Sequence, residues 1–189
     1  MKSIAIIPAR SGSVRVPNKN IRMFHGKPII AYSIKAAQDS GLFDDIVVST
    51  DSMEIAAVAE RYGATVFMRG PDDGSRGTQE VAKEVLDAMR HDGVCCTIYA
   101  TTPMLTGSTL RVAYSVWQDM NAPYLVPVGK WLEDPGMFYV GLSSSFRDEI
   151  PLFCASLFKV DPRTAIDINT LDDWAEAERM YAELHKGEA

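Results

Sequence analysis

Short apolar runs alternate along the chain with segments whose apolar residues recur at helical spacing. The apolar runs, which predict strands, lie at residues 3–8, 46–50, 65–67, 94–99 and 124–128. The amphipathic segments, which predict helices, lie at about residues 28–40, 52–62, 77–91, 108–119 and 170–184. Continuous apolar strands that alternate with helices are typical of a mainly parallel sheet covered on both faces. We therefore predict one α/β domain over residues 1–189, with a sheet between two layers of helices.

The alternation stops in the last third of the chain. Helical periodicity is lost between residues 129 and 160, where short apolar pieces at 137–140 and 155–158 predict added strands, some of them antiparallel. The final helix has the clearest start, because Thr170 is a good N-cap and Asp173 follows three residues later.

Composition narrows the class of protein. The 189 residues are 47% hydrophobic and 23% charged, which is typical of a soluble globular chain. A net charge of −6 disfavours non-specific binding to nucleic acid or to an anionic membrane. Cys95 and Cys96 are adjacent in an apolar run, which indicates reduced thiols rather than a disulfide framework. Since no apolar stretch is long enough to span a bilayer, we expect a cytoplasmic protein.

The loop after the first strand is basic and rich in small residues. Between residues 10 and 27 the chain carries no acid and five cations, namely Arg10, Arg15, Lys19, Arg22 and Lys27. Ser11, Gly12 and Ser13 allow backbone N–H groups to approach an anion, at the strand end where open α/β sheets bind ligands. The loop lacks the Walker A and dinucleotide-binding patterns. It predicts a polyphosphate site, and the alternative is a solvated basic loop.

Four segments resemble one enzyme family. The run IIPARSGSVRVPNKNI is similar to the opening signature of the acylneuraminate cytidylyltransferases, although Ser11 replaces a glycine and Val14 a lysine. The segments VCCTIYATTPML and EDPGMFY resemble the pseudaminic-acid branch of that family, and AIDINTLDDW resembles its later Asp-Trp motif. The resemblance covers nearly the whole chain. It implies a Rossmann-like three-layer α/β/α nucleotidyltransferase fold.

The resemblance also implies an activity and a site. Such an enzyme transfers CMP from CTP to a sugar acid, such as pseudaminic or sialic acid, with Mg²⁺ and with release of pyrophosphate. Arg10 and Lys19 would be catalytic because they offset charge on the leaving pyrophosphate. The implied nucleotide site consists of Ala9, Arg10, Ser11, Gly12, Ser13, Arg15, Lys19, Asn20, Arg69, Thr78, Tyr99, Ala100 and Thr101. Milder alternatives are a surface charge for Arg69, a helix cap for Thr78 and a core position for Tyr99.

The metal pair departs from the family pattern. The family uses two carboxylates one residue apart on a strand, whereas this chain has Asp167 and Asn169 at the matching positions. Asn supplies a carbonyl oxygen without charge, so we expect weaker binding of Mg²⁺. Asp51, after the second predicted strand, is expected to be the N-cap of the next helix, or else an extra polar group of the site.

The second departure is a shortened connection. Residues 127–135 lead directly from the fifth predicted strand to the Phe-Tyr segment, where the family carries a longer arm that lines the acceptor pocket and helps dimerisation. The resemblance implies CTP and a small acidic sugar as partners. Because the arm is shortened, a homodimer stays an open alternative. Two rival functions also stay open: transfer to a smaller acid or a phosphonate, and a nucleotide-binding pseudoenzyme or regulatory protein.

Overall fold

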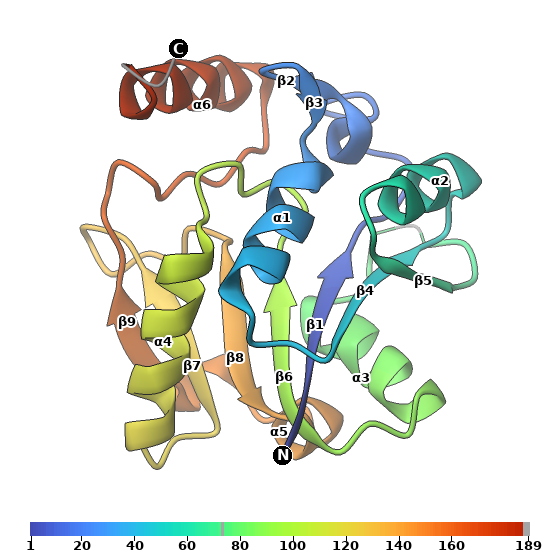
Figure 1. Ribbon diagram of the computed structural model, residues 1–189, viewed down its shortest axis with the longest axis vertical. Helices are drawn as coiled ribbons and strands as arrows, with labels where there is room; N and C mark the ends of the chain where they lie inside the picture. The colour runs from blue at the N-terminus through green and yellow to red at the C-terminus, as the bar shows by residue number, and fades with distance from the viewer. Residues whose placement is uncertain (73, 187–189) are drawn as a thin grey trace.

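A seven-stranded sheet forms the centre of the structure, a computed structural model that describes residues 1–72 and 74–186 (Figure 1). Its strand order is β5-β4-β1-β6-β8-β7-β9, and only β8 runs antiparallel to its neighbours within this described sheet. The strands are β1 (Lys2–Pro8), β4 (Asp45–Thr50), β5 (Thr65–Met68), β6 (Gly93–Ile98), β7 (Tyr124–Val128), β8 (Phe138–Leu142) and β9 (Ser156–Lys159). The predicted mainly parallel sheet with an antiparallel addition is confirmed.

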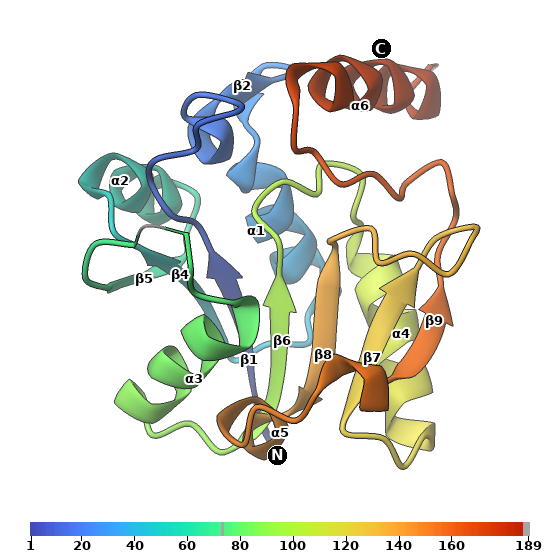
Figure 2. The ribbon, with the colours of Figure 1, turned by 180° about the vertical axis from the view of Figure 1, so that it is seen from behind.

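Helices cover both faces of this sheet (Figures 1 and 2). One layer contains α1 (Ile30–Ser40), α2 (Met53–Arg61) and α4 (Gly107–Asp119), and the other contains α3 (Thr78–Ala88) and α5 (Ser143–Arg147). The helix α6 (Leu171–Leu184) lies beyond the carboxyl ends of the parallel strands, beside the small hairpin of β2 (Met23–Phe24) and β3 (Lys27–Pro28). Two 3₁₀ turns, η1 (Lys19–Ile21) and η2 (Leu152–Cys154), complete the described elements.

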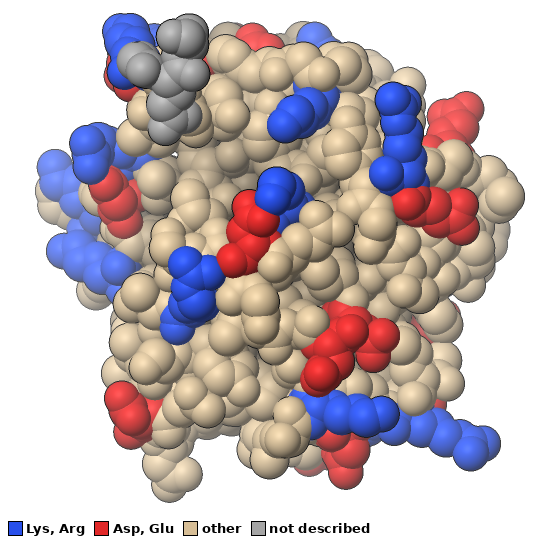
Figure 3. Space-filling model, in the orientation of Figure 1, with Lys and Arg blue, Asp and Glu red and all other residues tan. Residues whose placement is uncertain are grey.

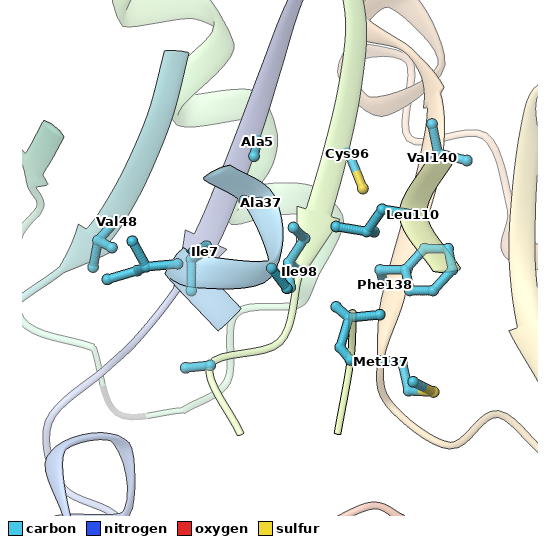
Figure 4. Packing of buried hydrophobic residues seen from close by; sticks show 14 of the residues in the cluster. Ala5, Ile7, Ala37, Val48, Cys96, Ile98, Leu110, Met137, Phe138 and Val140 are labelled. Carbon is cyan, nitrogen blue, oxygen red and sulfur yellow. The ribbon is translucent and has the colours of Figure 1, made fainter. Parts of the chain in front are cut away.

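Burial on both faces explains why the strands are continuous apolar runs. In β1, Ala5 and Ile7 belong to the cluster under α1 and α4, whereas Ile4 and Ile6 belong to the cluster under α3. Figure 4 shows Ile7 and Ile98 packing in the first cluster beside Ala37 of α1 and Leu110 of α4. Within the described chain the three cysteines are free, and two of them lie buried in β6.

An aromatic cluster holds α6 in place. The ring of Phe24 lies edge-on to Tyr32, Trp174 and Tyr181, with centroid distances of 5.7, 5.5 and 5.4 Å. The predicted capping box is confirmed, since the Thr170 side chain accepts from the Asp173 backbone and the Asp173 carboxylate accepts in return. This docking carries the chain segment before α6 across the carboxyl ends of β1 and β6.

The family resemblance places Asp167 and Asn169 on a strand, but the segment before α6 is not a strand. Residues 165–169, all of them described, form no strand. The backbone N–H groups of Asn169 and Thr170 donate to the Asp173 carboxylate, at 2.9 and 2.7 Å. These donors therefore serve the helix cap and are not available to a sheet.

Two further differences concern helices. The predicted helix at 28–40 begins at Ile30, because Pro28 pairs with Met23 in the small hairpin. The short helix α5 was not predicted, since three serines in five residues give no helical signal. Tertiary contacts hold α5 instead: Phe146 is fully buried, and the Arg147 guanidinium donates to the carbonyl of Leu86 at 3.2 Å.

The distribution of surface charge and the length of the helices are relevant to possible binding partners. On the face shown in Figure 3, acidic and basic side chains are dispersed among other residues. None of the helices in the described ranges is long and apolar enough to cross a membrane.

Candidate active site

A cleft of about 230 Å³ opens at the carboxyl ends of β1 and β6. Open α/β sheets bind ligands at this edge, because the loops that leave parallel strands meet there. The residues that line it are Pro8, Arg10, Ser13, Arg15, Lys19, Asn20, Arg69, Asp72, Arg76, Thr78, Val81, Tyr99, Ala100, Thr101 and Asn169. Most of the implied nucleotide site therefore comes together around one cavity. Ala9 is fully buried, and Ser11 and Gly12 line an adjacent smaller hollow.

The loop after β1 is fastened by side chains at both ends. The Ser11 backbone N–H donates to Asp51 Oδ1 at 2.6 Å, and its hydroxyl donates to Asp51 Oδ2 at 2.9 Å. The buried Asn20 amide donates to the carbonyl oxygen of Arg10 at 2.9 Å. Gly12 has a φ of +68°, a backbone conformation that suits glycine. These contacts set the loop shape before any ligand binds.

The expectation that Asp51 caps a helix is wrong. The N-cap of α2 is Ser52, whose hydroxyl accepts from the Ile55 backbone at 3.3 Å. Asp51 points instead to the neighbouring loop, because parallel pairing of β1 and β4 places Ser11 beside it. Burial acts to raise the pKa of Asp51, but the hydrogen bonds from Ser11 outweigh it, and the pKa lies below its ordinary value.

Three cations of this loop converge on the cleft. No carboxylate among the described residues forms a salt bridge with Arg10, Arg15 or Lys19. Arg15 Nη2 donates to Asn169 Oδ1 at 3.3 Å, and Lys19 Nζ donates to the carbonyl of Ile168 at 2.6 Å. Positive charge that is held by neutral acceptors is available to an anion.

Crowding of these charges affects Lys19. Burial lowers the pKa of Lys19, Asp167 opposes the shift, and the charges of Arg15 and Arg10 add to it. A bound polyanion would relieve the repulsion between the three cations. The loop therefore has the electrostatics of a phosphate site.

The loop after β5 brings a buried ion pair to the cleft. The side chains of Arg69 and Asp72 are 1% and 2% exposed and form a salt bridge, so Arg69 is not a surface charge. Arg76, which also lines the cleft, pairs with Glu84 at 2.6 Å. Asp72 and Arg76 were not predicted as site residues, because residues 68–76 carry no periodic pattern. The one available signal was the position of this loop after β5, a strand of the same sheet that pairs with β4.

Thr78 and Tyr99 meet at the inner end of the cleft. Thr78 begins α3, but the N-cap is Gly77, so the capping alternative for Thr78 is wrong. Its hydroxyl donates to the Tyr99 hydroxyl at 3.3 Å. Tyr99 follows β6 and is half-buried, and its hydroxyl also contacts that of Tyr139 at 3.0 Å. Thr78 and Tyr99 thus bring two hydroxyl groups to the cleft.

Asp167 and Asn169 lie side by side even though they are not on a strand. Asn169 Nδ2 donates to Asp167 Oδ2 at 2.6 Å, and Asn169 lines the cleft. A Cβ atom on Gly136 would lie 3.3 Å from the Asp167 carboxylate, so glycine there leaves space around it. Carboxylate and amide oxygens are ligands for a hard divalent cation.

Comparison with known proteins identifies the family. The sequence model of the family described as "Cytidylyltransferase" matches residues 4–135. The chain belongs to the cytidylyltransferase family. It is 34% identical to the pseudaminic acid cytidylyltransferase of Campylobacter jejuni, over 98% of this chain and 99% of that protein. It is 47% identical to the CMP-N,N'-diacetyllegionaminic acid synthase of Legionella pneumophila, over 47% of this chain and 38% of that one.

Solved structures confirm the cytidylyltransferase fold. CMP:2-keto-3-deoxy-manno-octonic acid synthetase, in complex with CTP, has a TM-score of 0.81, with 15% identity, 97% of this chain and 100% of that chain covered. A nucleotidyl transferase from Methanothermobacter has a TM-score of 0.74, with 16% identity, 97% of this chain and 99% of that chain covered. This cytidylyltransferase is thus a CTP-dependent nucleotidyltransferase with the Rossmann-like α/β fold.

The alignment with the Campylobacter relative is longer than this chain, and the connection between β7 and β8 in the structure is short. The alignment with the Campylobacter enzyme extends over 230 residues, whereas this cytidylyltransferase has 189. Here residues 129–137 alone join β7 to β8. The backbone of this short connection turns at Gly136, which has a φ of +60° beside Asp167.

The contact between Asp51 and Ser11 predicts a pH-dependent stability. Since the pKa of Asp51 is lowered in the folded state, its ionised form stabilises the fold above the unfolded pKa of about 3.9. This contribution is lost as the pH falls through the folded pKa. We expect Asp51→Asn to unfold at a lower temperature than the wild type at pH 7, and the difference to shrink below about pH 4.

Thermal unfolding between pH 3 and pH 7 measures this effect. Asp92→Asn is the matched control, because the Asp92 side chain is 90% exposed and its surface ion pair contributes little. Equal unfolding temperatures for Asp51→Asn and the wild type at pH 7 would contradict the role of Asp51.

Proposed function

We propose that this protein transfers CMP from CTP to a nonulosonate and releases pyrophosphate. The observation that carries the proposal is one cleft with two kinds of lining. Arg10, Arg15 and Lys19 supply positive charge to it, and Thr78 and Tyr99 supply hydroxyl groups. A triphosphate suits the cations and a base suits the hydroxyl groups. The pseudaminic and legionaminic acid relatives support a nonulosonate as acceptor.

The reaction requires positioning rather than covalent help from the protein. An acceptor oxygen attacks the α-phosphorus and gives up its proton to solvent water, and the bond from the α-phosphorus to the bridging oxygen breaks. The electrons of that bond leave with pyrophosphate. Arg10 and Lys19 offset the charge that grows on this leaving group. The Ser11 N–H is already bound to Asp51, so its part is to shape the loop.

Asp167 and Asn169 would hold a divalent cation, together with phosphate oxygens of CTP. No group of three or more His, Cys, Asp or Glu side chains in the described ranges could hold a metal by itself. One carboxylate and one amide therefore need the substrate to complete the ligand set. The bound cation would neutralise phosphate charge. The pair would keep the cation beside the basic loop, because Arg15 Nη2 of that loop donates to Asn169 Oδ1 at 3.3 Å.

Release of pyrophosphate tests the proposed function. The assay combines CTP with pseudaminic, legionaminic and N-acetylneuraminic acids, a smaller keto acid and a phosphonate. We expect turnover with CTP and at least one nonulosonate. Turnover with only the smaller acid or the phosphonate would overturn the acceptor assignment. Binding of CTP without turnover of any acceptor would contradict the enzyme and favour a binding protein.

Loss of a cation from the basic loop should slow the reaction. We expect Arg10→Ala or Lys19→Ala to lower kcat/KM by on the order of 100-fold, because charge on the leaving pyrophosphate loses a partner. Arg163→Ala is the control, since Arg163 is exposed and pairs with Asp161 outside the cleft. Near-normal kcat/KM values in both loop variants would contradict the phosphate site.

The metal pair predicts opposite effects for two substitutions. Asn169→Asp replaces the amide that donates to Asp167 by a second carboxylate, so we expect half-maximal rate at a lower Mg²⁺ concentration. Asp167→Asn should nearly abolish turnover, because the charged ligand is lost. Asp172→Asn is the control, as Asp172 is exposed and does not line the cleft. Rates are measured against metal concentration, and unchanged metal dependence in Asp167→Asn would rule out this site.

A further inference from the structure

A chain of hydrogen bonds leads from the cleft into the short connection between β7 and β8. Thr78 Oγ1 contacts the Tyr99 hydroxyl at 3.3 Å, and the Tyr99 hydroxyl contacts that of Tyr139 at 3.0 Å. The Tyr139 hydroxyl then donates to Asp134 Oδ2. Thr78 and Tyr99 line the cleft, whereas Tyr139 lies behind them and is 3% exposed. We call Thr78, Tyr99, Tyr139 and Asp134 the hydroxyl relay.

The carboxylate at one end determines the direction of every bond in the relay. A carboxylate only accepts hydrogen bonds, and each hydroxyl has one hydrogen to donate. Tyr139 uses its hydrogen on Asp134, so its oxygen must accept from Tyr99. Tyr99 has then used its hydrogen, so its oxygen must accept from Thr78. Burial raises the pKa of Tyr139 well above its ordinary value, which keeps its hydrogen in place.

The end of the relay at the cleft is therefore an acceptor. The single hydrogen of Thr78 points to Tyr99, which leaves lone pairs on the Thr78 oxygen for a ligand. Cytosine carries an amino group, a donor, where the corresponding position of uracil carries an oxygen, an acceptor. The Thr78 oxygen, as an acceptor, can bind the amino group of cytosine and repels the oxygen of uracil.

We propose that Asp134 and Tyr139 are positioning residues for base selection: through Tyr99 they hold the Thr78 hydroxyl as an acceptor for the cytosine amino group, against the oxygen of uracil. This inference rests on the proposed function, which places the base at Thr78 and Tyr99. Neither Asp134 nor Tyr139 lines the cleft, so both act only through the relay.

Substitution of the carboxylate by an amide tests the relay. In Asp134→Asn the oxygen can still accept from the Gly136 backbone N–H, a bond of 2.8 Å here, so the turn is retained. The new NH₂ group can donate to Tyr139, which reverses the relay and lets Thr78 donate into the cleft. We expect the ratio of kcat/KM for CTP to that for UTP to fall at least about tenfold.

The neighbouring residue provides a matched control. Glu133→Gln makes the same chemical change one position earlier, where the carboxylate accepts from the Trp131 backbone at 2.7 Å and does not touch the relay. We expect this variant to keep the wild-type ratio. Unfolding temperatures of both variants show whether they fold, and dissociation constants for CTP and UTP provide a second measure of the preference.

A double-mutant cycle distinguishes an effect on the relay from a general loss of stability. Tyr99→Phe breaks the relay at its centre and should by itself reduce the preference for CTP. Adding Asp134→Asn to Tyr99→Phe should change the ratio no further, because the two ends are already disconnected. Additive effects on the ratio would overturn the relay.

The outcomes separate the two proposals. A wild-type preference for CTP that folded Asp134→Asn retains would overturn the relay alone. Equal use of CTP and UTP by the wild type would overturn the relay together with the base assignment of the proposed function. A fall in the ratio for Asp134→Asn and not for Glu133→Gln supports the relay.

Discussion

Parallel pairing of β1 with β4 and β6 is the constraint from which the site follows. It brings the loops after these strands to one edge of the sheet, although they lie far apart in the sequence. The contact between Ser11 and Asp51 depends directly on this register, and so does the approach of Tyr99 to the basic loop. The apolar runs that require burial on both faces thus also decide where polar residues meet.

Charge in the cleft is arranged in two different ways. Arg69 is compensated by Asp72 in a buried pair, and a buried ion without a partner would be strongly unfavourable. Arg10, Arg15 and Lys19 lack such a partner among the described carboxylates and are held by carbonyl and amide oxygens. The buried pair of Arg69 and Asp72 shapes the lining of the cleft. The three cations without a carboxylate partner can bind an anionic ligand, which is consistent with the absence of acidic residues from the basic loop.

The chain after β7 completes the cleft from the other side. Docking of α6 through Phe24 and Trp174 carries Asn169 to the basic loop. The short connection between β7 and β8 contributes Asp134 to the relay and Gly136 beside Asp167. Both the metal pair and the relay therefore include residues that follow β7.

The sequence by itself determined those strands, helices and caps that depend on residues close together along the chain. The apolar strands, the helix stripes and the Thr170 cap depend on residues within a few positions of one another, and the structure has them as predicted. The basic loop was recognisable for the same reason. The resemblance of four segments to a known family added the activity and most residues that line the cleft.

Tertiary structure alone decided where polar side chains find their partners. Asp51 has the local sequence of a helix cap, yet its carboxylate accepts from Ser11 of the adjacent loop, and Ser52 caps α2. Asp167 and Asn169 have the spacing of a strand, but the cap of α6 takes the backbone donors that a sheet would need. The relay joins residues from α3, the loop after β6, β8 and the connection before β8, and no pattern along the chain reveals such a set. Its direction follows from a carboxylate 56 residues away from Thr78 along the chain, a distance that only the fold can close.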